Sequence, residues 1–453
     1  MPDQAKKPYV KPILTRQHAG FTGKFAPFAV SRYKDKIDGV EVKDLLARFD
    51  SPVFVYSHRM LKKKYDSAFQ AFSTRYPKVQ FAWSYKTNYL RAVCRSFHDL
   101  GSWAEVVSGF EYDLARSFGV PGDRIVYNGP SKSRASLLRA ASEGAMINID
   151  GFDEIPELES IAAELGRPVE FGVRLNMTIP GHASWDRFGL SLESGEALHA
   201  VRRALAGKKL SLVGIHAHLG TFILEPQVYR EAVLKMVELA KVLKHEFGIR
   251  LRYLDIGGGF ASKSKLKGSY LPTDQLAPDF DKYAEVICSP IRDGFDQKEL
   301  PLLMLETGRA LVDEAGSLIA TVVSTKKSPS GIRSLVLDAG VNLLFTSYWY
   351  DFDIVPTSDK GAFSEVHNVY GPLCMQIDIV GENLRLPSLE KGESVVIHPV
   401  GAYNNTQWMQ FIQLRPRVVM IGENGEVDII RDAESRDYVT QLDKVPPWLG
   451  RKD

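Results

Sequence analysis

The sequence predicts an α/β fold with an added β domain, namely a (β/α)8 barrel over residues 51–311 and an antiparallel β domain over residues 312–453. Residues 1–50 are expected to join the β domain. A chain of 453 residues is too long for one ordinary hydrophobic core and suits two domains. From Pro52 onward, short apolar runs alternate with longer amphipathic stretches, a pattern typical of parallel βα units. About eight such units in about 260 residues match a barrel of this kind.

The predicted barrel strands are apolar runs without alternation, as expected for strands that are buried on both faces. They are PVFVYS (region 51–57), VQFAWSYK (79–86), SWAEVVS (102–108), RIVYNG (124–129), AMINID (145–150), VEFGVRLN (169–176), LVGIHAHLG (212–220), LRYLDIGGG (251–259) and PLLMLETG (301–308). Amphipathic segments between them predict helices, among them Arg59–Tyr76, Ala135–Glu143, Glu154–Leu165 and Gln227–Phe247. A short helix is also expected near Val42–Arg48.

The last third of the chain has a different pattern. Short runs such as SLVLDAG, ESVVIHPVGAY and PRVVMIGENGEVDII are separated by Gly, Pro and Asn turns. Many short strands with such turns predict an antiparallel β domain.

Composition excludes several classes of protein. The net charge is +2, from 57 basic and 55 acidic residues, and gives no sign of a nucleic-acid or membrane-surface role. Three dispersed cysteines fit a reducing compartment and lack metal-ligand spacing, so no bound metal is expected. The N-terminus has no apolar signal core, and no apolar run reaches about eighteen residues. We therefore expect a cytoplasmic protein.

Polar residues at the ends of the predicted strands are candidates for chemistry, because a barrel carries its active site at the C-terminal ends of its strands. Lys86 ends an apolar strand, where partial desolvation would lower the pKa of its amine and make it a nucleophile towards a carbonyl. The alternative is a lysine whose head reaches solvent.

Other strand ends carry residues that suit an anion or an aromatic ring. Gly257, Gly258 and Gly259 would let backbone N–H groups approach a phosphate, or they form only a tight turn. His216 and His218 point the same way on a strand and could bind a metal, cover a ring, or be structural. The remaining candidates are Glu306 as partner of a protonated ring nitrogen and Arg309 as an anion ligand, unless the two form only an ion pair. Tyr403 could bind a phosphate and Cys374 could donate or accept a proton, or both could be structural.

The order of these segments resembles that of the fold-type III decarboxylases that use pyridoxal 5′-phosphate (PLP), the group of diaminopimelate, ornithine and arginine decarboxylases. The similarity covers roughly residues 50–415 and is greatest to diaminopimelate decarboxylases. The matching segments are FAWSYKTN, SWAEVVSGFE, YNGPSKS, GVRLN, RFGLSL, GIHAHLGT, LDIGGGF, LETGR, LVLDAG, GPLC and GAY. The fold implied is that of alanine racemase and ornithine decarboxylase.

The resemblance implies a role for each candidate residue. Lys86 would bind the cofactor as a Schiff base, His218 would stack on its ring, and Glu306 would pair with its ring nitrogen. Glu105 and Arg174 would also belong to the cofactor site, and Arg309 would hold phosphate or substrate carboxylate. The implied phosphate ligands are Gly220, Thr221, Gly257, Gly258, Gly259 and Tyr403. Tyr350, Met375, Arg309 and Tyr403 would contact the substrate.

The resemblance also implies a homodimer with shared active sites. Cys374 would then enter the site from the partner subunit and return a proton to the substrate Cα after CO2 leaves.

Two departures from the family pattern affect the substrate end of the site. Met375 follows the cysteine of GPLC, where diaminopimelate decarboxylases have a glutamate that holds the distal amine. Thr346 stands where an arginine would hold the distal carboxylate, four residues before Tyr350. Neither residue can form the expected ion pair, so we expect a non-standard amino acid, such as a biosynthetic diamino acid or conjugate carrying a larger group.

Several other functions remain open on the sequence alone. One is an authentic meso-diaminopimelate decarboxylase, and another is an amino-acid racemase of the same fold. A third is a PLP carrier protein, against which the C-terminal domain argues. The last is a metal-dependent barrel hydrolase that uses His216 and His218.

Overall fold

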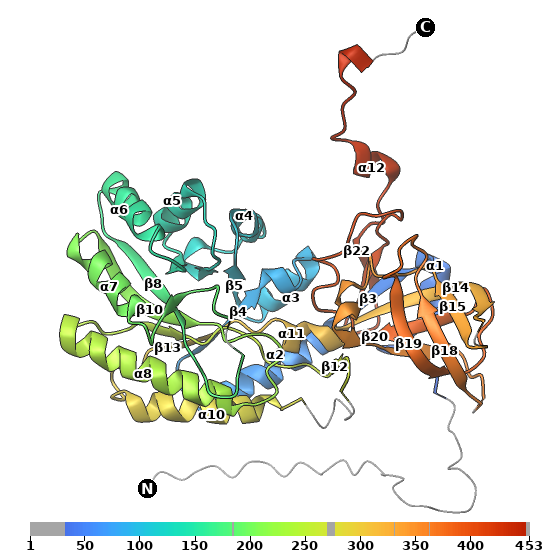
Figure 1. The fold of residues 1–453 in the computed structure, drawn as a ribbon, viewed down its shortest axis with the longest axis horizontal. Helices are drawn as coiled ribbons and strands as arrows, with labels where there is room; N and C mark the ends of the chain where they lie inside the picture. The colour runs from blue at the N-terminus through green and yellow to red at the C-terminus, as the bar shows by residue number, and fades with distance from the viewer. Residues whose placement is uncertain (1–31, 184, 270–276, 330, 362, 450–453) are drawn as a thin grey trace, which may run out of the picture.

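The computed structural model describes residues 32–183, 185–269, 277–329, 331–361 and 363–449. Residues 1–31 of the expected N-terminal segment lie outside this range. Figure 1 shows a barrel surrounded by helices on one side of the molecule and a β domain on the other.

Among the described residues, eight parallel strands close into the predicted barrel, because β4 pairs with both β13 and β5 and β8 pairs with both β7 and β10. The barrel strands are β4 (Val79–Ser84), β5 (Trp103–Val106), β6 (Ile125–Tyr127), β7 (Met146–Ile149), β8 (Val169–Asn176), β10 (Leu210–Ala217), β11 (Tyr253–Asp255) and β13 (Leu302–Leu305). A short strand, β9 (Leu190–Ser191), extends β8 outside the ring. The strands face an apolar core, as the non-alternating runs predicted.

Helices follow most barrel strands and cover the outside of the barrel (Figure 1). They are α2 (His58–Ser73), α3 (Arg91–Asp99), α4 (Gly109–Ser117), α5 (Arg134–Glu143), α6 (Glu154–Leu165), α7 (Glu196–Ala206), α8 (Gln227–Phe247), α10 (Phe280–Gly294) and α11 (Arg309–Val312). Single-turn 3-10 helices are η1 (Tyr85–Thr87), η2 (Gly122–Arg124), η3 (Asp313–Ala315), η4 (Phe345–Tyr348) and η5 (Pro447–Leu449).

The second sheet has the strand order β19-β18-β15-β14-β3-β21-β22, with β20 and β17 attached through β14. Its strands are β3 (Val53–Ser57), β14 (Gly316–Lys327), β15 (Arg333–Leu337), β17 (Asp353–Pro356), β18 (Glu365–Tyr370), β19 (Ile379–Leu386), β20 (Ser394–His398), β21 (Val418–Ile421) and β22 (Val427–Arg431). Most pairs are antiparallel, as predicted, but β15–β18 and β21–β3 are parallel. The helix α12 (Arg436–Thr440) follows this sheet.

The assignment of residues 51–57 to the barrel is wrong. This run forms β3, which lies between β14 and β21 in the second sheet. All five residues of β3 are buried, because the strand is central in its sheet. A central strand of any sheet gives the same continuous apolar run as a barrel strand, so the pattern could not separate the two.

The described N-terminal residues pack against the β domain. A hairpin of β1 (Lys36–Ile37) and β2 (Val40–Glu41) precedes α1 (Val42–Phe49), which lies over the predicted helix. Side chains of these elements form one apolar cluster with residues of β3, β14, β20 and β21. The hairpin itself pairs with no strand of the larger sheet within the described chain.

A small ladder joins a barrel loop to the second domain, where β12 (Lys265–Leu266) pairs with β16 (Tyr350–Asp351). None of the helices in the described part of the chain has both the length and the apolarity needed to cross a membrane.

Candidate active site

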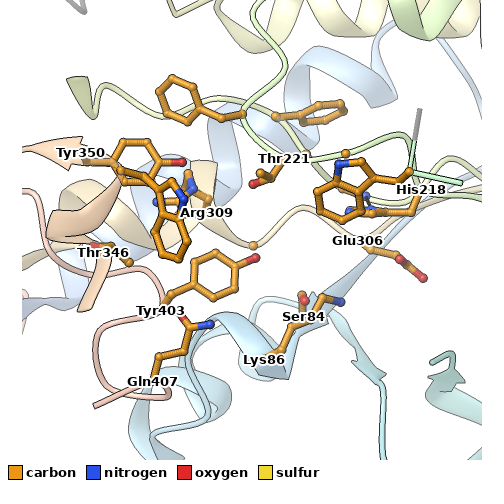
Figure 2. A pocket seen from close by; sticks show the side chains of 18 of the residues that line it. Ser84, Lys86, His218, Thr221, Glu306, Arg309, Thr346, Tyr350, Tyr403 and Gln407 are labelled. Atoms are coloured by element: carbon orange, nitrogen blue, oxygen red, sulfur yellow. Dashed lines mark hydrogen bonds between the residues drawn. The ribbon is translucent and has the colours of Figure 1, made fainter. Parts of the chain in front are cut away.

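One cavity of about 550 Å³ lies at the C-terminal ends of four barrel strands and is closed by residues of the second domain. We call it the main cavity. Its lining residues are Ser84, Lys86, Trp185, His218, Gly220, Thr221, Phe222, Gly258, Gly259, Phe260, Leu266, Glu306, Gly308, Arg309, Thr346, Trp349, Tyr350, Tyr403 and Gln407. In Figure 2, Lys86, His218 and Glu306 lie towards one end, Thr346 and Tyr350 towards the other, and Tyr403 between them.

Lys86 faces this cavity from η1, directly after β4. Its Nζ donates hydrogen bonds to both carboxylate oxygens of Glu105, at 2.8 and 2.6 Å. Burial lowers the pKa of Lys86, but Glu105 and Glu306 outweigh that effect and raise the pKa above the ordinary lysine value. The expected lowered pKa is therefore wrong, because neighbouring strands bring carboxylates that the sequence of β4 does not reveal.

A chain of buried hydrogen bonds crosses the barrel beneath Lys86. The Tyr253 hydroxyl donates to Asn148 Oδ1 at 2.7 Å, and Asn148 Nδ2 donates to Asn128 Oδ1 at 2.8 Å. Asn128 Nδ2 then donates to Glu306 Oε1 at 2.5 Å and to Glu105 Oε1 at 3.3 Å. This chain fixes both carboxylates, so Lys86 and Glu306 are held relative to one another at one end of the cavity.

Glu306 lies just after β13 and is almost fully buried. Burial raises the pKa of Glu306, but His216, Asp255 and Lys86 together hold that pKa well below the ordinary carboxyl value. Glu306 is therefore an ionised carboxylate facing the cavity.

His218 lies just beyond β10 and is a neutral imidazole. Burial, with Lys86 and Arg174 nearby, lowers the pKa of His218 to about 3. Its Nδ1 accepts a hydrogen bond from the Gly258 amide at 3.1 Å. The ring face is thereby fixed beside Trp185, whose ring centroid lies 5.6 Å away.

The two histidines do not form one metal site. His216, Asp255 and Glu306 each offer a ligand atom within 4.8 Å of the others, but His218 is not in this group. The hydrolase alternative, which paired His216 with His218, is therefore not supported by the geometry of the described residues.

The glycine run after β11 is required by close packing. A Cβ on Gly257 would lie 2.7 Å from the Ala217 carbonyl oxygen, and one on Gly258 would lie 2.7 Å from that of Glu306. Gly259 has a φ of +97°, which favours glycine, and a Cβ there would lie 2.5 Å from the Gly220 oxygen.

The amides of this run are only partly available to a ligand. Gly257 N donates to Asp255 Oδ1 at 2.9 Å, and Gly258 N donates to His218. Two of the three amides are used in this way, whereas Gly259, Gly220 and Thr221 line the cavity and their amides make no such hydrogen bond among the described residues.

Arg309 supplies positive charge to the cavity. Its guanidinium carbon lies 4.5 Å from the Tyr350 ring centroid and 4.9 Å from that of Tyr403. Nη1 is 3.6 Å from Asp313 Oδ2, while Nε is buried without a hydrogen-bond partner among the described residues. A buried unpaired N–H on a fixed guanidinium suits an anion.

Comparison with known proteins agrees with this geometry. Residues 62–313 match the family described as pyridoxal-dependent decarboxylase, pyridoxal binding domain. The chain belongs to this family. It is 30% identical over 417 residues to the diaminopimelate decarboxylase of Aquifex aeolicus, an alignment that covers 89% of this chain and 94% of that protein.

A solved structure extends the similarity to the whole fold. The diaminopimelate decarboxylase of Methanocaldococcus jannaschii, in complex with L-lysine, superimposes with a TM-score of 0.83 at 28% identity. That comparison covers 92% of this chain and 98% of the other. The protein is thus a PLP-dependent amino-acid decarboxylase with a barrel and a β domain, and its family decides against the racemase, carrier and hydrolase alternatives.

The main cavity of this decarboxylase fits the cofactor of its family. A lysine amine, an ionised carboxylate and a neutral histidine ring lie around one end. Arg309 offers the unpartnered buried N–H that a phosphate or carboxylate would satisfy.

Some expected site residues lie outside the main cavity of this decarboxylase. Arg174 is paired with Asp150 at 2.9 Å, and its guanidinium lies over the Phe188 ring. Cys374 is exposed, and Met375 lines a separate surface hollow with residues of β14, β15 and β18. The structure of one chain therefore does not bring Cys374 or Met375 to the main cavity.

The sequence analysis did not predict a role for Asp255 or for two buried asparagines: Asn128 donates to both Glu105 and Glu306, and Asn148 links Asn128 to Tyr253. A lone asparagine near the end of an apolar strand, as in RIVYNG and AMINID, was the available signal. Trp185 and Gln407 were also missed and have no comparable signal.

Proposed function

We propose that this decarboxylase acts on an amino acid whose side chain does not end in the ammonium and carboxylate groups of meso-diaminopimelate. The observation that carries the proposal is the far end of the main cavity. Thr346 lies there, and its hydroxyl donates to Asn404 Oδ1 at 2.9 Å. At the position where diaminopimelate decarboxylases are expected to have an arginine, this chain has a threonine hydroxyl that already donates a hydrogen bond to Asn404.

The other side chains of the far end are aromatic or uncharged, and the charge beside them is that of Arg309, which lies over the Tyr350 ring. Phe222 and Tyr350 lie 5.2 Å apart between ring centroids, and Trp349, Leu266 and Gln407 complete the wall. An ammonium group that left water for this surface would lose hydration without gaining an ion pair, because the charged side chain beside it is the cationic Arg309. A substrate with a larger, uncharged or conjugated end is more compatible with these side chains.

We assign the reaction end as follows. Lys86 would hold the cofactor through its amine, and His218 would lie against its ring, because both line the same end of the cavity. Bound PLP supplies a protonated pyridine ring that accepts the electron pair left when CO2 departs. Glu306, kept ionised by its neighbours, would favour the protonated form of the ring nitrogen. Glu105, hydrogen-bonded to Lys86, positions the amine.

We assign anion binding to Arg309, Tyr403, Gly220, Thr221 and Gly259, which line the same cavity. Arg309 is held between Tyr350 and Tyr403, so it cannot swing away from a phosphate or carboxylate in this space. Arg174 is paired with Asp150 and, through its charge, helps to keep His218 neutral. Cys374 and Met375 reach the cavity from a second copy of the chain, where Cys374 returns a proton to the substrate Cα.

A CO2-release screen tests the substrate proposal. Purified protein loaded with PLP is assayed on meso-diaminopimelate, lysine, ornithine, arginine and on diamino acids acylated at the distal amine. We expect the acylated compounds to give a kcat/KM at least about tenfold above that for meso-diaminopimelate, equivalent to about 1.4 kcal/mol of discrimination.

Rapid turnover of meso-diaminopimelate would overturn the substrate proposal and leave the decarboxylase assignment intact. That outcome is the second candidate function, and the names of the relatives favour it. A variant with Thr346→Arg serves as a matched comparison, because it restores the charge at the far end. We expect it to raise activity on meso-diaminopimelate relative to the acylated compounds.

A further inference from the structure

Three ionisable side chains meet behind the main cavity on adjacent strands. His216 of β10 is directly paired in register with Asp255 of β11, and Glu306 follows β13, the next strand. All three are buried, and one ligand atom of each lies within 4.8 Å of the others. His216 Nε2 is 3.5 Å from Glu306 Oε2.

This cluster contains polar atoms without ordinary partners. Both ring nitrogens of His216 and Oδ2 of Asp255 are buried and lack a partner of ordinary hydrogen-bond geometry among the described residues, and the polar group that both residues face is Glu306. Unsatisfied buried atoms are costly, so their presence next to Glu306 needs an explanation. The charges of the neighbouring groups provide that explanation.

Two buried carboxyl groups this close together cannot both be ionised, because their mutual repulsion is large at low dielectric. The groups around Glu306 favour its charge, since Asn128 donates to Oε1 and Lys86 and His216 lie nearby. Asp255 accepts from the Gly257 amide at Oδ1, and its interaction with Glu306 favours the neutral form of Asp255. The single proton of the pair therefore belongs to Asp255.

The remaining charged or titratable neighbours agree with this distribution. Glu105 also raises the pKa of Asp255, and Glu105 itself forms an ion pair with Lys86. Tyr253 and His218 are neutral, because burial raises the pKa of the first well above its ordinary value and lowers that of the second. Burial and Glu306 likewise raise the pKa of Asp255 well above its ordinary value.

We propose that Asp255 and His216 are positioning residues that keep Glu306 ionised, Asp255 by remaining a neutral acid beside it and His216 by facing its second oxygen. The proposal rests on the assigned role of Glu306 at the cofactor ring nitrogen. In this arrangement the negative charge stays on the one carboxylate that faces the cavity, and the protonated ring nitrogen is its counterion.

The proton position can be measured without substrate. Protein is loaded with PLP that carries nitrogen-15 in the ring, and solid-state NMR separates a protonated ring nitrogen from a neutral one. The variants are Asp255→Asn, which keeps a neutral donor of the same shape, Asp255→Leu, which removes it, His216→Phe, and Glu306→Gln. Asp338→Leu, which removes a carboxylate bonded to the Thr321 amide in the β domain, is the control. Thermal unfolding follows the stability of each protein.

We expect a protonated ring in the parent, in Asp255→Asn and in the control. Asp255→Leu and His216→Phe should each raise the pKa of Glu306 by about one unit. The ratio of protonated to neutral ring nitrogen should then fall about tenfold. Glu306→Gln should give a neutral ring.

Two results would overturn the inference. One is a neutral ring in Asp255→Asn, because Asp255 would then act through its charge. The other is a fully protonated ring in both Asp255→Leu and His216→Phe while Glu306→Gln is neutral. A protonated ring in Glu306→Gln would instead refute the role of Glu306 itself, so the two failures are distinguishable.

Discussion

At the scale of single residues, the ionisation of the site depends on partners that come from different strands. Lys86 carries a charge because Glu105 and Glu306 raise its pKa, although burial alone lowers that pKa. Such partners are invisible in the local sequence, which showed only a lysine after an apolar run. The types of residue were therefore predictable, and their protonation states were not.

Lys86 should be the lysine that PLP labels. Treating the loaded protein with borohydride fixes the cofactor on the amine that binds it, and peptide mapping then identifies the residue. Lys132 is an internal control, because it is also buried but its Nζ is bound to Glu154 at 2.7 Å outside the main cavity. Label on Lys132, or undiminished labelling of a Lys86→Ala protein, would contradict the assignment.

Replacing Glu306 should damage turnover far more than stability. Glu306→Ala removes the anion that faces the ring nitrogen, and we expect kcat to fall by about two orders of magnitude or more. The loss of its hydrogen bond from Asn128 should cost only about 1–3 kcal/mol in the free energy of unfolding. Steady-state kinetics and denaturant unfolding measure the two quantities, and equal turnover in both proteins would disprove the role.

At the scale of elements, the sequence predicted the barrel strands well because each is buried on both faces and followed by a helix. β3 was the exception, since a central strand of the second sheet has the same apolar run. The parallel pairs β15–β18 and β21–β3 were also unpredicted, because strand partners far apart in sequence leave no trace in local periodicity. The same limit applies to Asn128 and Asn148, whose partners lie on other strands.

The start of α4 holds a buried acid that should make stability depend on pH. Glu111 accepts a hydrogen bond from the Val107 amide at 2.8 Å, while Ser108 caps the helix. Burial, with Glu105 nearby, raises the pKa of Glu111 to about 7. Because the folded pKa exceeds the unfolded one, the associated stability is present below about pH 4.5 and is lost as the pH rises through about 7.

Glu111→Gln removes this ionisation and keeps an acceptor for the Val107 amide. We expect the variant to be more stable than the parent at pH 8, by up to about 3 kcal/mol, and equally stable near pH 4.5. Denaturant unfolding at the two pH values measures the difference. A variant that is less stable than the parent at both values would show that the acid is not strained in the fold.

At the scale of the whole molecule, one chain does not supply the complete proposed site. Cys374 is exposed and Met375 faces a separate hollow, whereas Lys86 lies in the main cavity. A dimer in which each chain completes the other's cavity would resolve this, and it predicts a specific behaviour of mixed variants.

Lys86→Ala and Cys374→Ala proteins should each be inactive, but a mixture of the two should recover activity. If the subunits reassort at random, half of the dimers contain one intact site out of two, which gives roughly a quarter of the parental rate. CO2 release after mixing on the substrate found in the screen is the measurement. No recovery between two variants that are shown to exchange subunits would place both residues in one chain's site or exclude Cys374.

The position of β3 also constrains how the protein can be made. Its first neighbour, β14 (Gly316–Lys327), is synthesised more than 250 residues after β3. Its second neighbour, β21 (Val418–Ile421), follows more than 360 residues after β3. The strand must therefore wait, unpaired and apolar, while the entire barrel is translated. A nascent chain stalled before β21 would expose the unpaired backbone and apolar side chains of β3. A chaperone that binds short hydrophobic segments should therefore associate with stalled chains and dissociate from the finished protein.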